Sequence, residues 1–174
     1  LEQKFMSINE KVLKVFYNGI NNAGKVRLSI VTQNGVDLDS GELAQLLAEG
    51  SDFFALTEYK PFGTSFYGVE IVNIDYQNID VSFRVSLDGS FDTDAIRRQI
   101  QVAFTKYLDF RFFDTSKQKV EWDNLLQIVK SIPGVLYVPD QNFYPQTDIV
   151  CDIHKLPRLR GFLMLDINGD IIQN

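Results

Sequence analysis

The chain is poor in the residues that cross-link small proteins or bind metals. Its 174 residues include one cysteine, one histidine and one tryptophan. A single cysteine excludes an internal disulfide framework, and one Cys with one His cannot form the paired motifs of a structural zinc site. The fold therefore depends on a hydrophobic core, and a domain of about this length buries roughly 70% of its unfolded surface.

The sequence also lacks long apolar runs and any excess of positive charge. No run approaches the roughly 18 to 20 apolar residues that a membrane-spanning helix needs. The 17 Lys and Arg residues are outnumbered by 23 Asp and Glu residues, whereas binding to a phosphate backbone depends on clustered Lys and Arg. We therefore expect neither a membrane nor a nucleic acid as partner. Because the chain begins at Leu1 and shows no signal-peptide pattern, we expect a fragment of a longer protein.

The first part of the chain predicts a hairpin and a helix. Residues 12–17 and 26–30 have strand patterns and are separated by a turn-rich segment, which is typical of a hairpin. Asp39 and Glu42 have the spacing of a capping box and begin a short amphipathic helix, for which Gly50 is the predicted end.

The clearest pattern in the chain lies at residues 79–87, where apolar and polar residues alternate strictly. This alternation predicts a strand with one buried and one solvated face. Two helices should follow, over residues 92–110, with Asp92 or Thr93 as cap, and over residues 122–131. Pro133 and Gly134 then end the second helix and turn the chain into a strand at residues 135–138.

This order of elements predicts an α+β fold. We expect a small mixed β-sheet covered by two or three helices, an N-terminal hairpin and helix unit, and a C-terminal arm that ends in a hairpin at Asn168-Gly169. The corresponding regions are residues 1–60 for the N-terminal unit, 61–138 for the α+β core and 139–174 for the arm.

Residues that could carry chemistry are few. Asp148, Cys151, Asp152 and His154 lie within seven residues, but a strand with alternating polar and apolar positions explains them better than a metal site. The string DINGD at residues 166–170 resembles the start of a calcium loop, yet its glycine is misplaced and no glutamate follows. No serine lies in a nucleophile-elbow pattern. We therefore expect no enzyme activity, cofactor, metal or small-molecule substrate.

The central part of the chain resembles a known family. The alternating strand at residues 81–87, the acidic cap at Asp92, the helices at 96–108 and 125–132, and the Pro133-Gly134-Val135 turn into Tyr137-Val138 resemble the C-terminal part of the baseplate J-like family, the wedge proteins of contractile phage tails. The stretch EWDNLLQIVKSIPGVLYVPD, followed by FYPQTDI and KLPRLRGF, is similar to the large baseplate wedge subunits of T-even-like phages. The resemblance covers residues 60–138 well and the first 60 residues only loosely.

The resemblance implies a virion structural protein rather than a catalyst. Such a protein would be assembled in the host cytoplasm, would lie in the tail baseplate, and would form homodimers and ring contacts with itself and contacts with other wedge proteins. The family motif is structural, so no catalytic residue carries over. The alternative is a non-viral adaptor module that has a similar small α+β fold and a different function.

Two sets of residues follow from these expectations. The first contains the predicted core and turn residues Trp122, Pro133, Gly134 and Val135. The second contains aromatic, arginine and neighbouring residues, which are typical of protein interfaces. We predict contacts with other subunits at Phe62, Phe66, Tyr67, Phe143, Tyr144, Leu156, Pro157, Arg158, Leu159, Arg160 and Phe162.

Overall fold

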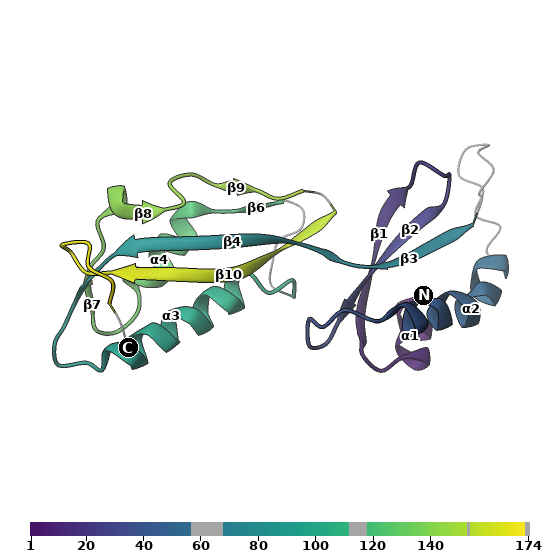
Figure 1. Cartoon of the computed structure of the whole chain (residues 1–174), viewed down its shortest axis with the longest axis horizontal. Helices are drawn as coiled ribbons and strands as arrows, with labels where there is room; N and C mark the ends of the chain where they lie inside the picture. Colours follow the sequence, from purple (N-terminus) through teal and green to yellow (C-terminus); the bar gives the residue numbers. More distant parts are fainter. Residues whose placement is uncertain (57–67, 112–117, 153, 173–174) are drawn as a thin grey trace. The chain divides into compact units, whose positions relative to one another are not determined.

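The computed structural model describes residues 1–56, 68–111, 118–152 and 154–172, with residues 51–56 described by their backbone alone (Figure 1). The chain divides into two compact units, Leu1–Asp75 and Tyr76–Asn174. Each unit combines helices with a small sheet, which confirms the predicted α+β class. No helix in the described ranges has the length and apolar character needed to cross a membrane.

Unit 1 is a three-stranded sheet with two helices. β1 (Val12–Ile20) and β2 (Val26–Thr32) form the predicted antiparallel hairpin. β3 (Val69–Asn73) pairs with β2 in the parallel direction, which requires a crossover connection. The crossover contains α2 (Ser40–Leu56).

The helix α2 begins as predicted but ends later. The Asp39 Oδ1 atom accepts the Glu42 backbone N–H at 2.8 Å, and a Glu42 carboxylate oxygen accepts the Asp39 N–H at 3.0 Å, so the capping box is confirmed. The predicted end at Gly50 is wrong, because α2 continues to Leu56. A glycine inside a helix costs only about 1 kcal/mol relative to alanine. Gly50 is buried, and packing around it outweighs this small local cost.

A further helix, α1 (Glu2–Ile8), was not predicted. Its seven residues contain one fully buried side chain, Phe5, and a single anchor does not produce the repeating apolar stripe by which a helix is recognised in a sequence. Phe5 packs in the core of unit 1 with residues of the sheet and of α2, including Leu28, Ile30, Leu46 and Ile71.

Unit 2 is built around β4 (Asp75–Arg84), the central strand of the order β10-β4-β8. β8 (Phe143–Tyr144) pairs with it in the antiparallel direction, with Phe83 opposite Phe143. β10 (Lys155–Leu165) lies on its other side. The arrows of β4 and β10 point the same way in Figure 1, and the Val85 N–H beyond β4 donates to the Leu165 carbonyl at the end of β10 at 2.9 Å. The region predicted as an arm thus supplies a strand to this sheet.

Two helices of unit 2 follow the sequence prediction closely. α3 (Thr93–Tyr107) starts at Asp92, whose side chain accepts the backbone N–H groups of Asp94 and Ala95, as expected of an N-cap. α4 (Trp122–Lys130) is shorter than α3 and begins at the predicted residue. The remaining elements are the strand pairs β5 (Ser86–Leu87) with β7 (Val135–Tyr137) and β6 (Lys119–Val120) with β9 (Ile149–Val150), and the short 3₁₀ helix η1 (Asp140–Asn142).

The core of unit 2 forms between one face of the sheet and the two helices. The Phe83 ring stacks on Phe143 at 5.6 Å and on Phe162 at 6.2 Å between centroids, and meets Phe104 of α3 edge-on at 6.4 Å. Each buried aromatic contributes roughly 1.5–3 kcal/mol by leaving water, and each ring pair about 0.5–1.5 kcal/mol more. This cluster fixes the sheet against α3 and leaves its opposite face for other contacts.

The two predicted turns are confirmed. Gly134 has a φ of +91° and passes the chain from α4 into β7. The Asn168-Gly169 turn closes a hairpin in which the Asp166 N–H donates to the Asp170 carbonyl at 2.8 Å and Leu165 bridges Ile171.

Candidate protein interface

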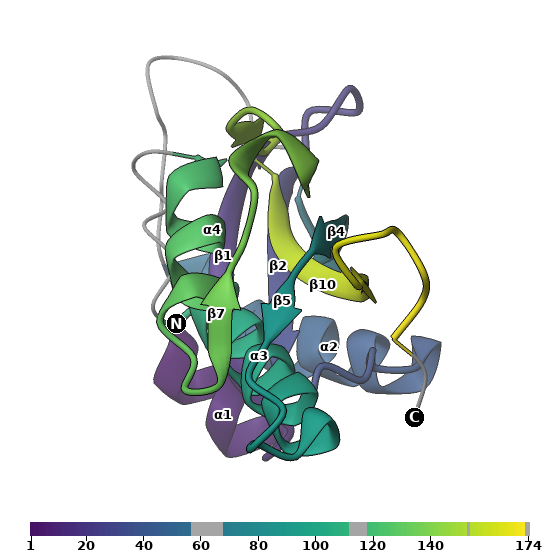
Figure 2. The same ribbon diagram turned by 90° about the vertical axis from the view of Figure 1, so that its left-hand side faces the viewer.

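The candidate interface is the outer face of the β10-β4-β8 sheet. Figure 2 shows α3 and α4 on one side of this sheet. Along β4, the buried residues Ile79, Val81 and Phe83 alternate with less buried ones, because successive side chains of a strand point to opposite faces. Tyr76, Asp80 and Arg84 thus belong to the face that points away from the core.

Asp80 and Arg160 join β4 and β10 on this face. The Arg160 Nε atom donates to Asp80 Oδ1 at 2.9 Å, and Nη2 donates to the other carboxylate oxygen. The hydrogen bonds from Arg160 lower the pKa of the Asp80 carboxyl, and the same contact raises the pKa of Arg160. Both side chains are more than half exposed, so the pair adds little stability. Its effect is to hold the Arg160 guanidinium across the two strands.

Other cations lie on the same strands. The Arg158 guanidinium lies 5.2 Å from the centre of the Tyr76 ring, within the range of a cation–π contact. Arg84 lies beside Gly169 of the terminal hairpin, with its Nη1 atom 3.5 Å from the Ile167 carbonyl oxygen. Stacked and paired in this way, the arginines lose less side-chain freedom when a partner binds than free side chains would.

Exposed apolar side chains accompany these arginines. Tyr144 of β8 is 56% exposed and Leu163 of β10 is 40% exposed. Tyrosine and arginine are enriched in the residues that contribute most to protein–protein binding. We call the set Tyr76, Asp80, Arg84, Tyr144, Arg158, Arg160 and Leu163 the sheet face.

The residues predicted as interface fall into four groups. Tyr144, Arg158 and Arg160 are exposed and belong to the sheet face, whereas Leu159 and Phe162 are partly buried against the core. Phe143, Leu156 and Pro157 are buried within unit 2 and cannot reach a partner in this conformation. Phe62, Phe66 and Tyr67 lie outside the described residues. The interface stays a prediction, and the three exposed residues are the ones available to it.

The predicted core and turn residues lie around α4. Trp122 is the first residue of α4 and packs partly buried against the core of unit 2. Its indole N–H has no acceptor among the described residues, and its backbone N–H donates to Asp148 at 3.0 Å. Pro133, Gly134 and Val135 follow α4, and Val135 packs against the same core.

The four residues weighed as metal ligands have other partners. Asp148 accepts from the Lys119 ammonium at 2.8 Å, and this hydrogen bond lowers the pKa of its carboxyl. Cys151 is buried, which raises the pKa of its thiol. His154 is exposed, and its backbone N–H donates to Asp152. Within the described ranges, no group of three or more His, Cys, Asp or Glu residues could hold a metal ion.

The sequence analysis did not predict the sheet-face residues of β4, which are Tyr76, Asp80 and Arg84. The alternation at residues 79–87 assigned Asp80 and Arg84 to a solvated face, but nothing local shows that β10 pairs beside β4. The opposite charges of Asp80 and Arg160 were the available signal, and they are 80 positions apart.

The fold is similar to that of a solved structure, although the sequence comparisons found no match. No family model matches the chain, and no curated protein is similar to it. A solved structure is similar: a chain in the cryo-EM structure of the anti-feeding prophage (AFP) baseplate, 6-fold symmetrised.

The likeness extends over 91% of this chain, with a TM-score of 0.55 and 15% sequence identity. This chain spans 36% of that baseplate chain. At such low identity the similarity is one of fold. At 91% of the chain, it includes most of both units.

Proposed function

We propose that this protein is a structural component of a contractile phage tail baseplate, where it serves as a wedge protein. The observation that carries the proposal is the likeness in fold to a baseplate chain over 91% of this sequence. The resemblance of residues 60–138 to the baseplate J-like family supports it independently, because it rests on motifs such as the Pro133-Gly134-Val135 turn rather than on overall shape.

The protein would act through surfaces and not through chemistry. Tyr144, Arg158 and Arg160 of the sheet face would contact other wedge subunits, and identical subunits would join one another around the tail. Contacts between different patches of identical subunits produce a closed ring when the rotation between neighbours closes. A face that combines fixed arginines with exposed aromatic side chains suits this role.

Immunogold electron microscopy of contractile particles from the source tests the proposal. An antibody raised against this chain should label the end of the tail that bears the baseplate. A matched antibody that has been absorbed with the purified chain should not label. If the particles stay unlabelled while soluble extract contains the antigen, the baseplate role is wrong and the adaptor function takes its place.

A further inference from the structure

The sheet face is positively charged, although the chain as a whole is acidic. Its charged members are three arginines and one aspartate: Arg84, Arg158, Arg160 and Asp80. The whole chain, in contrast, has a formal net charge of −6. A surface of one sign on a protein of the other sign selects partners that carry the complementary charge.

Two of these arginines have no carboxylate partner in the described part of the chain. Arginines on other surfaces, such as Arg27, Arg98 and Arg111, form ion pairs with nearby carboxylates. The Arg84 guanidinium instead lies 3.5 Å from the Ile167 carbonyl oxygen, and the Arg158 guanidinium lies over the Tyr76 ring. In a chain with an excess of acidic residues, two arginines that lack a carboxylate on one face indicate that another molecule supplies it.

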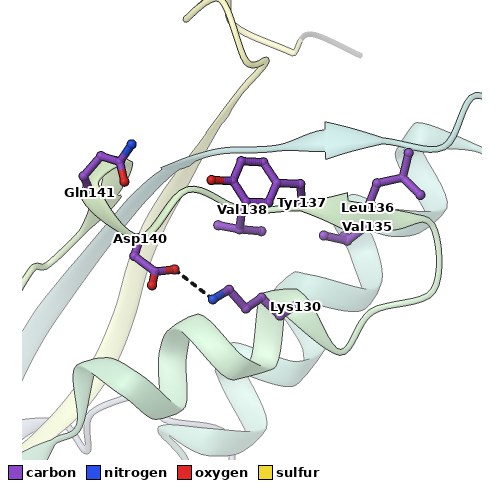
Figure 3. A pocket seen from close by; sticks show the side chains of 7 residues that line it. All are labelled: Lys130, Val135, Leu136, Tyr137, Val138, Asp140 and Gln141. Atoms are coloured by element: carbon purple, nitrogen blue, oxygen red, sulfur yellow. Dashed lines mark hydrogen bonds and ion pairs between the residues drawn. The ribbon is translucent and has the colours of Figure 1, made fainter.

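A second surface of unit 2 does not share this charge. Beside β7, Figure 3 shows Lys130 reaching toward Asp140, and the ammonium lies 2.8 Å from the carboxylate. These two residues line a hollow of about 430 Å³ together with residues 135–138 and Gln141. Because its two charges neutralise each other, this hollow does not attract a charged partner as the sheet face does.

The guanidinium groups of the sheet face have hydrogen-bond donors available. A guanidinium has five N–H donors. Arg160 donates to Asp80 from Nε and Nη2, so both N–H groups of Nη1 remain. Arg158 contacts the face of the Tyr76 ring and donates to no other described residue. A carboxylate matches these groups, because it can accept two parallel N–H bonds from one guanidinium.

The spacing of the arginines limits the shape of the partner. Arg158 and Arg160 are two residues apart on β10, which corresponds to roughly 7 Å along a strand. Carboxylates at alternate positions of an extended segment have the same spacing. Tyr144 and Leu163 are exposed beside them and offer apolar contact. A segment with acidic residues at alternate positions and apolar residues between them therefore fits this face.

We propose that the sheet face binds an acidic segment of a different protein, whose carboxylates pair with Arg158, Arg160 and Arg84. The inference rests on the proposed function, because it takes the sheet face as the surface that contacts other wedge subunits. It adds the chemistry of the subunit that binds there.

Two other occupants fit the charges less well. Two copies of this chain, each with a net charge of −6, repel one another, and a symmetric contact would place the same arginines opposite each other. A nucleic acid is bound through many clustered Lys and Arg residues, whereas this face has three arginines next to Asp80, Tyr144 and Leu163.

Peptide titration of the whole ¹⁵N-labelled chain tests the inference. The probe is the blocked peptide acetyl-Glu-Leu-Glu-Tyr-Glu-amide, and amide chemical shifts report where it binds. We expect shifts at Arg158, Arg160 and Tyr144, and weaker binding when salt is added. The peptide acetyl-Gln-Leu-Gln-Tyr-Gln-amide has the same shape without charge, and its affinity should be at least about tenfold lower.

A pair of variants provides the control on the protein side. Arg158→Gln removes an arginine of the sheet face and should weaken binding of the acidic peptide several-fold. Arg98→Gln removes an exposed arginine of α3 and should leave the affinity unchanged.

Four results would overturn the inference. The first two are no shift on the sheet face and equal affinity for the glutamine peptide. The third is tighter binding of a short DNA duplex to the same residues, which would identify a nucleic acid as the occupant. The fourth is shifts on the sheet face that depend on protein concentration without peptide, which would identify a second copy.

The titration also separates this inference from the proposed function, because it needs no baseplate. If the tail is labelled by the antibody but the acidic peptide does not bind, the partner chemistry is wrong and the baseplate role stands. If the peptide binds but the tail is not labelled, the baseplate role alone is wrong.

Discussion

Gly134 lies at a position where any side chain would be unfavourable, for two reasons. Its φ of +91° is rarely adopted by residues with a side chain, and an added Cβ would lie 2.7 Å from Ile96 Cδ1 and 2.8 Å from Phe91 Cγ. These contacts come from the beginning of α3, so the glycine allows the turn after α4 to approach that helix closely.

Gly134→Ala should therefore lower the free energy of unfolding by about 2 kcal/mol or more, because backbone strain and overpacking add. Gly89→Ala is the matched control, since an added Cβ there meets no atom within 4 Å and its φ is ordinary. Chemical denaturation of both variants measures the difference, and equal stabilities would contradict the account of this turn.

Asp92 determines where α3 begins. Its two carboxylate oxygens accept backbone N–H groups that have no partner inside the helix. Asp92→Ala should cost about 1 kcal/mol of stability, whereas Asp92→Asn, which keeps an accepting oxygen, should be nearly neutral. Thermal unfolding of the two variants would show whether the cap or merely the negative charge is what matters.

Asp166 makes the terminal hairpin sensitive to acid. Its Oδ1 atom accepts the backbone N–H groups of Asn168, Gly169 and Asp170. These hydrogen bonds lower the pKa of the Asp166 carboxyl below the ordinary 3.8, and the bond from Asp170 has the largest effect. A lowered pKa means that the carboxylate stabilises the hairpin above pH 3.8 and that the contribution disappears as the pH falls through the lower, folded value.

An NMR titration should thus find Asp166 protonating below pH 3.8, with the amide shifts of Gly169 and Asp170 changing over the same pH range. Asp166→Ala should remove that pH dependence. If the amides of the turn titrate unchanged in the variant, another group is responsible.

At the scale of elements, the sheet face can be separated from the core. Tyr144 and Arg158 project away from the aromatic cluster, so Tyr144→Ala with Arg158→Ala should change the melting temperature of the purified chain little and should reduce its incorporation into baseplates. The control is Arg98→Ala with Val102→Ala, an exposed pair on α3. Quantitative blotting of purified particles measures incorporation, and equal loss from both double variants would count against the sheet face.

The elements also show how far the sequence alone reaches. Strict alternation at residues 79–87, the cap at Asp92 and the Pro133-Gly134 turn are local signals, and each predicted the observed structure. α1 was missed because one anchor, Phe5, makes no stripe, and the end of α2 was misplaced because packing outweighs the local cost of Gly50.

The site was harder to predict than the fold. Exposure of Tyr144, Arg158 and Arg160 and burial of Phe143, Leu156 and Pro157 depend on the pairing of β4 with β8 and β10, which is set by contacts between residues some 60 to 80 positions apart. Aromatic composition alone does not distinguish a core residue from a surface one.

At the scale of the whole molecule, the two units have separate cores. The residues packed around Phe83 all belong to unit 2, and those packed around Phe5 all belong to unit 1. Phe83→Ala should lower the stability of unit 2 by about 3–5 kcal/mol and leave amide-exchange protection at Leu28 and Ile30 of β2 unchanged. Loss of protection in both strands β2 and β4 would show that the units unfold together.

The buried thiol of Cys151 has a practical consequence. It is the one cysteine of the whole sequence, and burial both shields it and raises its pKa, so little reactive thiolate forms at neutral pH. A cysteine introduced at Tyr144 would then take up a maleimide dye or a photo-crosslinker selectively. The sheet face could thus be labelled, and its neighbours identified by mass spectrometry, without first removing a native cysteine.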